Sequence, residues 1–125
     1  MAGPKILLVD DDPAICASLQ FTLELQGFEV ETFASAEALT AFGGTAEPAC
    51  LILDFRLPGI DGLSLLEALR RLGVRAPAIV ITSNPRRAVR ERAAALGTVL
   101  VEKPLLGDEL ILAIRTLVPT SPTFV

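Results

Sequence analysis

The feature that most constrains the fold of this chain is a strict alternation between short apolar runs and longer segments with helical spacing. Runs of strand length lie at residues 5–9, 28–33, 49–53, 78–81 and 98–101. Each is followed by a segment that has the features of an amphipathic helix. This alternation predicts an α/β fold, a doubly wound (βα)5 sandwich whose five-stranded parallel sheet carries helices on both faces.

The pattern within each run indicates its place in the sheet. Residues 49–53 and 78–81 are uninterrupted apolar sequence, which is typical of central strands that are covered on both faces. Residues 28–33 alternate between apolar and polar, so we expect an edge strand with one wet face. A loop rich in proline and glycine follows residue 54, and the leucines at residues 65–72 then predict a helix.

The same start signal, an N-cap residue followed by proline, precedes two of the predicted helices. Asp12 is a favoured N-cap residue, and Pro13 suits the first helical position. Asn84 and Pro85 repeat this pair, which predicts that the fourth helix begins there and closes at Gly97.

Size and composition narrow the class of protein. The 125 residues, 51% of them hydrophobic, suffice for one domain with a substantial core. No apolar run approaches the ~18 residues of a membrane span, and no signal-peptide pattern is present, so we expect a soluble, cytoplasmic protein. Histidine is absent, which excludes histidine-based nucleophile systems and histidine-ligated zinc. The 2 cysteines are too few for a disulfide framework.

Charge is distributed unevenly along the chain. Residues 1–54 contain nine acids and one base, whereas residues 55–125 contain six acids and ten bases. Four arginines crowd into residues 86–92 without a neighbouring aromatic residue for base stacking. This basic segment therefore indicates a solvated helix face or a protein partner rather than nucleic acid.

Polar residues stand where the predicted strands end. Asp10 and Asp11 follow the first strand, Asp54 the third, Thr82 the fourth and Lys103 the fifth. Ligands of such sheets bind at the carboxyl ends of the strands. Clustered carboxylates raise each other's pKa unless a cation joins them, and an all-oxygen site selects Mg²⁺ or a similarly hard ion such as Mn²⁺. The alternative for the aspartates at positions 10–12 is that they only cap the first helix, which is our interpretation of Asp12.

Four segments together resemble the response-regulator receiver domains of bacterial two-component systems. They read ILLVDD at 6–11, LDFRLPGIDG at 53–62, VIT at 80–82 and EKP at 102–104. Each is weak alone, but all four occur in the right order at the right strand ends. The resemblance covers essentially the whole chain and implies the CheY-like, flavodoxin-like fold with strand order 2-1-3-4-5.

The resemblance also implies a role for each residue of the cluster. Asp54 is the phosphoacceptor, which takes a phosphoryl group from a phosphohistidine on a histidine kinase or a histidine phosphotransfer protein. Asp11 and Asp54 ligate Mg²⁺ directly, Asp10 does so mainly through water, and Arg56 contributes its backbone carbonyl. Lys103 pairs with the carboxylate and then with the phosphoryl oxygens. Arg56 also occupies a position that tunes the lifetime of the acyl phosphate.

Other positions belong to the switch that the family uses. Thr82 is the hydroxyl that is drawn toward the phosphoryl group, and Asn84 is a second lifetime-tuning position. Ser83 stands where a smaller residue is common. Pro104 follows a cis peptide in the family, which aims the preceding lysine inward. Leu100 occupies the position of the usual switch aromatic, so phosphorylation chemistry is retained while its usual route of transmission is in doubt.

The final helix suggests an interaction face. Residues 110–118 are apolar on nearly every side, although an outer helix buries only one stripe against the sheet. If Leu110, Ala113 or Ile114, and Leu117 face inward, then Ile111, Leu112 and Val118 remain exposed. We expect self-association or partner docking at the face formed by the fourth helix, fifth strand and fifth helix, with the four nearby arginines pairing with a partner's acids. These are Arg86, Arg87, Arg90 and Arg92.

The functional hypotheses differ in class. The leading one is a phosphorylatable, non-enzymatic receiver over residues 1–118, acting on a downstream protein or a fused output domain, with residues 119–125 as a tail or linker. A second is a receiver-like docking module that works largely without phosphorylation. A third is a phosphohydrolase of the haloacid dehalogenase type, but Pro13 stands where that enzyme class requires glycine.

Overall fold

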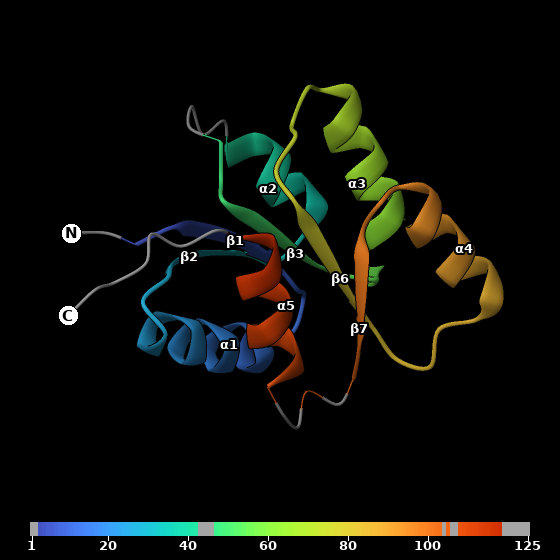
Figure 1. The fold of residues 1–125 in the computed structure, drawn as a ribbon. Coiled ribbons are helices and arrows are strands. Elements are labelled where there is room, and N and C mark those ends of the chain that lie inside the picture. The colour runs from blue at the N-terminus through green and yellow to red at the C-terminus, as the bar shows by residue number, and fades with distance from the viewer. Residues whose placement is uncertain (1–2, 43–46, 104, 106–107, 119–125) are drawn as a thin grey trace.

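The fold is a single parallel sheet between two layers of helices (Figure 1). The computed structural model describes residues 3–42, 47–103, 105 and 108–118. Its main sheet has the order β2-β1-β3-β6-β7, which confirms the predicted order 2-1-3-4-5. The strands are β1 (Lys5–Val9), β2 (Glu29–Phe33), β3 (Cys50–Asp54), β6 (Ala78–Thr82) and β7 (Val99–Glu102).

The sheet divides the apolar interior into two cores. Helices α1 (Pro13–Leu25) and α5 (Glu109–Leu117) cover one face. Helices α2 (Ala36–Phe42), α3 (Gly62–Arg71) and α4 (Arg87–Ala95) cover the other (Figure 1). Successive residues of each strand point to opposite faces, so the two cores draw on alternate positions of the same strands.

Burial of the strands follows their predicted places. Every residue of β3 and β6 is buried, as expected for central strands covered on both faces. Strand β2 lies at the edge of the sheet, and its charged residues remain accessible. The start of α1 is also as predicted, because Asp12 caps the helix by accepting a hydrogen bond of 2.9 Å from the Ala14 N–H.

The start of α4 is not where the sequence signal placed it. The helix begins at Arg87 after the N-cap residue Arg86, which makes no side-chain capping hydrogen bond. Asn84 instead has a positive φ of 47°, a left-handed conformation that asparagine tolerates better than most residues. Asn84 and Pro85 therefore form the turn that leaves β6, and the helix opens only after it.

A small hairpin stands where the sequence indicated only a loop. Strands β4 (Arg56–Leu57) and β5 (Ile60–Asp61) pair antiparallel directly after β3. Pro58 and Gly59 connect them, and Gly59 has a φ of 78° that favours glycine in a tight turn. Helix α3 follows at once and begins at Gly62, earlier than the leucine pattern indicated.

The exposed face of α5 is smaller than predicted. Leu112 is 61% exposed, as expected, but Val118 is only 4% exposed because it packs in the core beneath α1 and α5. Ile111 is half-buried against the same core. The predicted exposure of Val118 was therefore wrong, and Leu112 is the outward apolar residue of this helix. No helix among the described residues is long and apolar enough to cross a membrane.

Most arginines of the basic segment form ion pairs with acidic residues of the same chain. Arg87 lies 3.3 Å from Glu91 within α4, and Arg90 lies 3.0 Å from Glu102 on β7. Arg92 contacts Asp61, and only Arg86 forms no ion pair within the part of the chain that the structure describes. Fewer of these arginines than predicted are therefore free to pair with acidic residues of a partner.

Candidate functional site

Three carboxylates from two strand ends meet at the carboxyl edge of the sheet. Asp10 and Asp11 follow β1, and Asp54 is the last residue of β3. Adjacent parallel pairing of β1 and β3 brings these ends together, so that one carboxylate oxygen of each residue lies within 4.8 Å of the others. The structure therefore assembles the acidic cluster from the residues that the sequence singled out.

Asp10 is the most enclosed member of the cluster. Its side chain is buried, and its Oδ1 accepts a hydrogen bond of 2.9 Å from the Asp12 N–H. Its Oδ2 is also buried and has no hydrogen-bond partner among the described residues. Burial raises the pKa of Asp10 above its ordinary value, although the hydrogen bond from Asp12 acts in the opposite direction.

Lys103 enters the cluster from the end of β7. Its Nζ lies 3.0 Å from the Asp54 Oδ1. Burial is the largest influence on Asp54 and raises the pKa of its carboxyl, while Lys103 opposes that shift and Asp11 adds to it. The ammonium group of Lys103 thus offsets only part of the unfavourable free energy of burying the charged Asp54 carboxylate beside Asp11.

The chemistry of this donor set fits a hard divalent cation. Three convergent carboxylate oxygens and a buried oxygen without a partner are the kind of site in which Mg²⁺ or Mn²⁺ binds. Such an ion would provide a partner for the unpaired Asp10 oxygen and would reduce the repulsion among the carboxylates. Asp12, by contrast, points its carboxylate at the first turn of α1 and serves as its cap.

The loop after Asp54 packs tightly against it. The Phe55 N–H donates to the Ile81 carbonyl at 2.8 Å, and the Gly62 N–H donates to the Phe55 carbonyl at 2.8 Å. A Cβ atom on Gly62 would lie 2.5 Å from the Asp54 carbonyl oxygen, so only glycine fits there. The β4–β5 hairpin, with Arg56 exposed, is in this way closed over the backbone of Asp54.

The predicted switch residues occupy different surroundings. Thr82 is buried at the end of β6, and its carbonyl accepts a hydrogen bond of 2.8 Å from the Lys103 N–H. Ser83 and Asn84 are exposed, and Leu100 is half-buried in the core beneath α3 and α4. The prediction for Pro104 falls outside the described residues.

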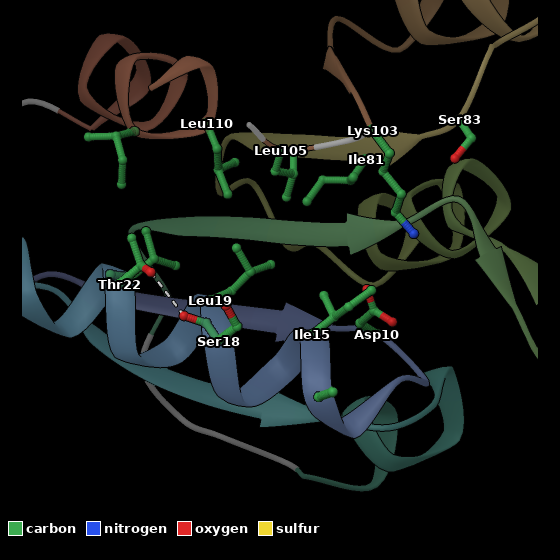
Figure 2. Close-up of a pocket in the computed structure, with 13 residues that line it drawn as sticks. Asp10, Ile15, Ser18, Leu19, Thr22, Ile81, Ser83, Lys103, Leu105 and Leu110 are labelled. Atoms are coloured by element: carbon green, nitrogen blue, oxygen red, sulfur yellow. Dashed lines mark hydrogen bonds between the residues drawn. The ribbon is translucent and has the colours of Figure 1, made fainter. Parts of the chain in front are cut away.

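An apolar groove leads away from the acidic cluster between α1 and α5. Figure 2 shows Asp10, Lys103 and Ser83 at one end of it, with the side chains of the two helices facing each other along its length. Its volume is about 620 Å³. The remaining labelled lining residues are Ile15, Ser18, Leu19, Thr22, Ile81, Leu105 and Leu110.

Sequence reasoning missed one polar contact of this region. Asp61 caps α3 by accepting a hydrogen bond of 2.7 Å from the Ser64 N–H. Its carboxylate also receives hydrogen bonds of 3.2 and 3.3 Å from Arg92 on α4. An aspartate immediately before a helical leucine pattern was an available sign of the cap, but nothing in the sequence indicated the long-range pairing with Arg92.

Fold and site together define a doubly wound α/β protein with an acidic, lysine-containing centre at the carboxyl edge of its sheet. The family model described as "Response regulator receiver domain" matches residues 6–115. The chain belongs to this family, whose function is to accept a phosphoryl group in two-component signalling, and for which Mg²⁺ is standard.

Individual relatives agree with this assignment. The chain is 36% identical over 116 residues to the transcriptional regulatory protein FixJ of Rhizobium meliloti (strain 1021), covering 92% of this chain and 57% of FixJ. It is 35% identical to the C4-dicarboxylate transport transcriptional regulatory protein DctD of the same organism, covering 91% of this chain and 25% of DctD. It therefore spans between a quarter and about half the length of these curated relatives.

Solved structures show the same architecture. The chemotaxis protein CheY4 of Vibrio cholerae has a TM-score of 0.84 at 25% identity, covering 94% of this chain and all of that one. A CheY-like receiver domain protein of Methanospirillum hungatei JF-1 has a TM-score of 0.82 at 29% identity, covering 91% of this chain and 92% of that one. The predicted receiver fold is thereby confirmed.

Proposed function

We propose that Asp54 is the residue that accepts the phosphoryl group in this chain. The observation that carries the proposal is the 3.0 Å contact between the Lys103 Nζ and the Asp54 Oδ1 at the opening of the acidic cluster. Asp54 also ends the fully buried strand β3, so its carboxylate is held in place by a rigid element. Asp12 lies nearby but is engaged as a helix cap.

The residues supply what phosphoryl transfer from a phosphohistidine requires. A carboxylate oxygen of Asp54 forms a bond to phosphorus as the bond from phosphorus to the imidazole nitrogen breaks, and that electron pair remains with the imidazole. Ionised Asp54 needs no general base, which agrees with the absence of histidine from the chain. Lys103 pairs with the carboxylate before transfer and with phosphoryl oxygens after it.

Mg²⁺ is the proposed cofactor. Asp11 and Asp54 would hold it directly, Asp10 mainly through water, and Arg56 through its backbone carbonyl. When bound, the ion supplies positive charge that offsets the repulsion between the carboxylates and the incoming phosphoryl oxygens. Mn²⁺ suits the same oxygen ligands.

The remaining assignments concern signalling after transfer. We assign Thr82 as the hydroxyl that turns toward the phosphoryl group, with Pro104 orienting Lys103. Arg56 and Asn84 influence how long the acyl phosphate survives. The partners are a histidine kinase or histidine phosphotransfer protein and a downstream protein or output domain, and the chain acts as a signalling module rather than as an enzyme on other substrates.

Phosphorylation by a small donor tests the proposal. Wild-type protein incubated with acetyl phosphate and Mg²⁺ should gain the mass of one phosphoryl group in intact-mass spectrometry, and Asp54→Asn should gain none. Asp12→Asn is the matched control, because asparagine caps a helix as well as aspartate does. Full uptake by Asp54→Asn, or none by wild type, contradicts the assignment. The latter result favours the docking module that works without phosphorylation, and continuous release of phosphate favours a phosphohydrolase.

A further inference from the structure

Arg92 on α4 connects that helix to the end of the β4–β5 hairpin and the start of α3, both of which follow Asp54 in the chain. Its Nη1 and Nη2 donate to Asp61 Oδ2 and Oδ1 at 3.2 and 3.3 Å. Its Nη2 also donates to the Ser64 Oγ at 3.1 Å and lies 3.8 Å from the Glu67 Oε1. We call these four residues the Arg92 network.

One side of the network is firmly anchored. Asp61 ends the β4–β5 hairpin, and five of the ten residues of α3 are buried. Gly62, the residue after Asp61, packs directly on the backbone of Asp54. The network therefore begins on a rigid extension of the phosphorylation site.

The other side is weakly anchored. Of the residues in α4, all of which the structure describes, Ala93 alone is fully buried. The helix has no side-chain cap at its start, and the preceding residues 83 and 84 are exposed. Elements with few buried contacts are displaced at the lowest free-energy cost. The network thus links the least buried helix on this face to one of the most buried.

Chain connectivity places α4 directly downstream of Thr82. If Thr82 turns toward a phosphoryl group on Asp54, as the proposed function has it, residues 83–86 are the segment that would carry the displacement to the start of α4. The half-buried Leu100 offers no aromatic ring whose rotation would make room for the movement. Because Arg92 lies on α4 and Asp61 ends the hairpin, displacement of α4 relative to the hairpin would stretch the contact between them.

We propose that Arg92 is a positioning residue whose contact with Asp61 holds α4 in its unphosphorylated place, so that this contact opposes the response to phosphorylation. The proposal rests on the proposed function of Asp54. A contact that exists in only one of two states shifts the equilibrium toward that state, so the Arg92–Asp61 contact favours the unphosphorylated state. By reciprocity, breaking the contact must strengthen binding of a phosphoryl analogue.

The test is the affinity of the full chain for beryllofluoride, a phosphoryl analogue, in the presence of Mg²⁺. Arg92→Gln should bind it about fivefold more tightly than wild type, which corresponds to about 1 kcal/mol, the usual upper range for a partly exposed ion pair. Arg92→Lys, which keeps the charge but not the paired hydrogen bonds, should lie between the two. A residue needed only for structural integrity would weaken binding or leave it unchanged.

Three further variants make the test specific. Asp61→Asn keeps the cap of α3 but loses the charge, so it should tighten binding similarly, and the double variant should bind no tighter than either single one. Arg87→Gln is the matched control, since Arg87 pairs with Glu91 inside α4 and moves with it. Hydrogen exchange should show faster exchange of α4 amides in Arg92→Gln, with β3 and β6 unchanged as proof of folding.

The outcomes separate the two proposals. Binding by wild type with no gain in Arg92→Gln, or with an equal gain in Arg87→Gln, overturns the role of Arg92 and leaves the proposed function intact. Absence of beryllofluoride binding in every protein, wild type included, overturns the proposed function and the role of Arg92 with it.

Discussion

At the scale of single residues, the site combines one buried carboxylate that is under-satisfied with one glycine that has no room for a side chain. Asp10 presents a buried oxygen without a hydrogen-bond partner among the described residues. Gly62 touches the backbone of Asp54. The first raises the free energy of the folded protein when no cation is bound, and the second fixes where Asp54 stands.

Replacing Asp10 by asparagine should stabilise the protein in the absence of divalent cations. Because burial raises the pKa of Asp10 in the folded state, the penalty is absent below about pH 4, where the unfolded group is protonated too, and grows as pH rises. At pH 7 in EDTA, urea unfolding should show Asp10→Asn to be more stable by about 1–3 kcal/mol. The advantage should shrink when Mg²⁺ is added, because Mg²⁺ stabilises wild type more. Lower stability of Asp10→Asn in EDTA contradicts this account.

Gly62→Ala should impair phosphorylation as well as stability. A Cβ atom at 2.5 Å from the Asp54 carbonyl oxygen forces the backbone of Asp54, the proposed phosphoacceptor, to shift. We expect a loss of about 1–3 kcal/mol in the free energy of unfolding and slower uptake from acetyl phosphate. Gly27→Ala is the control, because it strains a positive φ of 94° at the opposite edge of the sheet without a clash. Equal uptake rates in both variants would count against the role of Gly62.

At the scale of elements, α3 and α4 differ in how they are held, and the Arg92 network joins them. Burial tends to raise the pKa of Asp61, but the hydrogen bond from the Ser64 N–H and the contact with Arg92 outweigh it, so the pKa lies below its ordinary value. A carboxylate of this kind contributes stability above its unfolded pKa and loses that contribution as pH falls through the folded value.

Arg92→Gln should therefore destabilise the protein in a pH-dependent way. At pH 7 the loss should be about 0.5–1 kcal/mol, since both side chains are partly exposed to solvent. The difference from wild type should shrink as pH falls below about 4, where Asp61 becomes protonated. Urea unfolding at several pH values measures it, with Arg87→Gln as the control of equal charge. A difference that does not change with pH would separate the effect from Asp61.

Elements were more predictable from the sequence than the contacts between them. The apolar runs and strand-end polar residues were sufficient for the parallel sheet and the acidic cluster, because strand alternation and parallel connectivity bring the carboxyl ends of the strands to one edge. The order of the strands was an implication of the resemblance to receiver domains. The predicted start of α4 was wrong because asparagine serves both as a helix cap and as a residue in a left-handed turn. The pairing of Asp61 with Arg92 was unpredictable because nothing local in the sequence relates the end of the hairpin to a residue on α4. The burial of Val118 likewise depends on packing against α1.

At the scale of the whole molecule, the face formed by α4, β7 and α5 remains the proposed site of self-association or partner docking. Val99 at the rim is 36% exposed and Leu112 is 61% exposed, while most of the neighbouring arginines are already paired. The surface is therefore modest, and we expect any dimer to be weak and to be strengthened, not created, by phosphorylation.

Leu112→Glu should abolish that association. Sedimentation velocity of wild type with beryllofluoride and Mg²⁺ should show a concentration-dependent increase in sedimentation coefficient that is smaller without the analogue. A buried glutamate in the interface would cost several kcal/mol, which a weak dimer cannot absorb. Leu72→Glu is the control, because Leu72 is 74% exposed at the end of α3, away from this face. Monomeric wild type under both conditions rules out this use of the face.

The separation of the interior into two cores bears on how such a chain diversifies over generations. Ile6 and Leu8 face the core of α1 and α5, whereas Leu7 and Val9 face that of α2, α3 and α4. Because side chains of one core do not touch those of the other, the energetic effects of substitutions in the two combine almost additively. Selection can therefore act on the two sides separately. A lineage can remodel the helix surface on one side for a new partner while the other side and the shared carboxyl edge stay as they are.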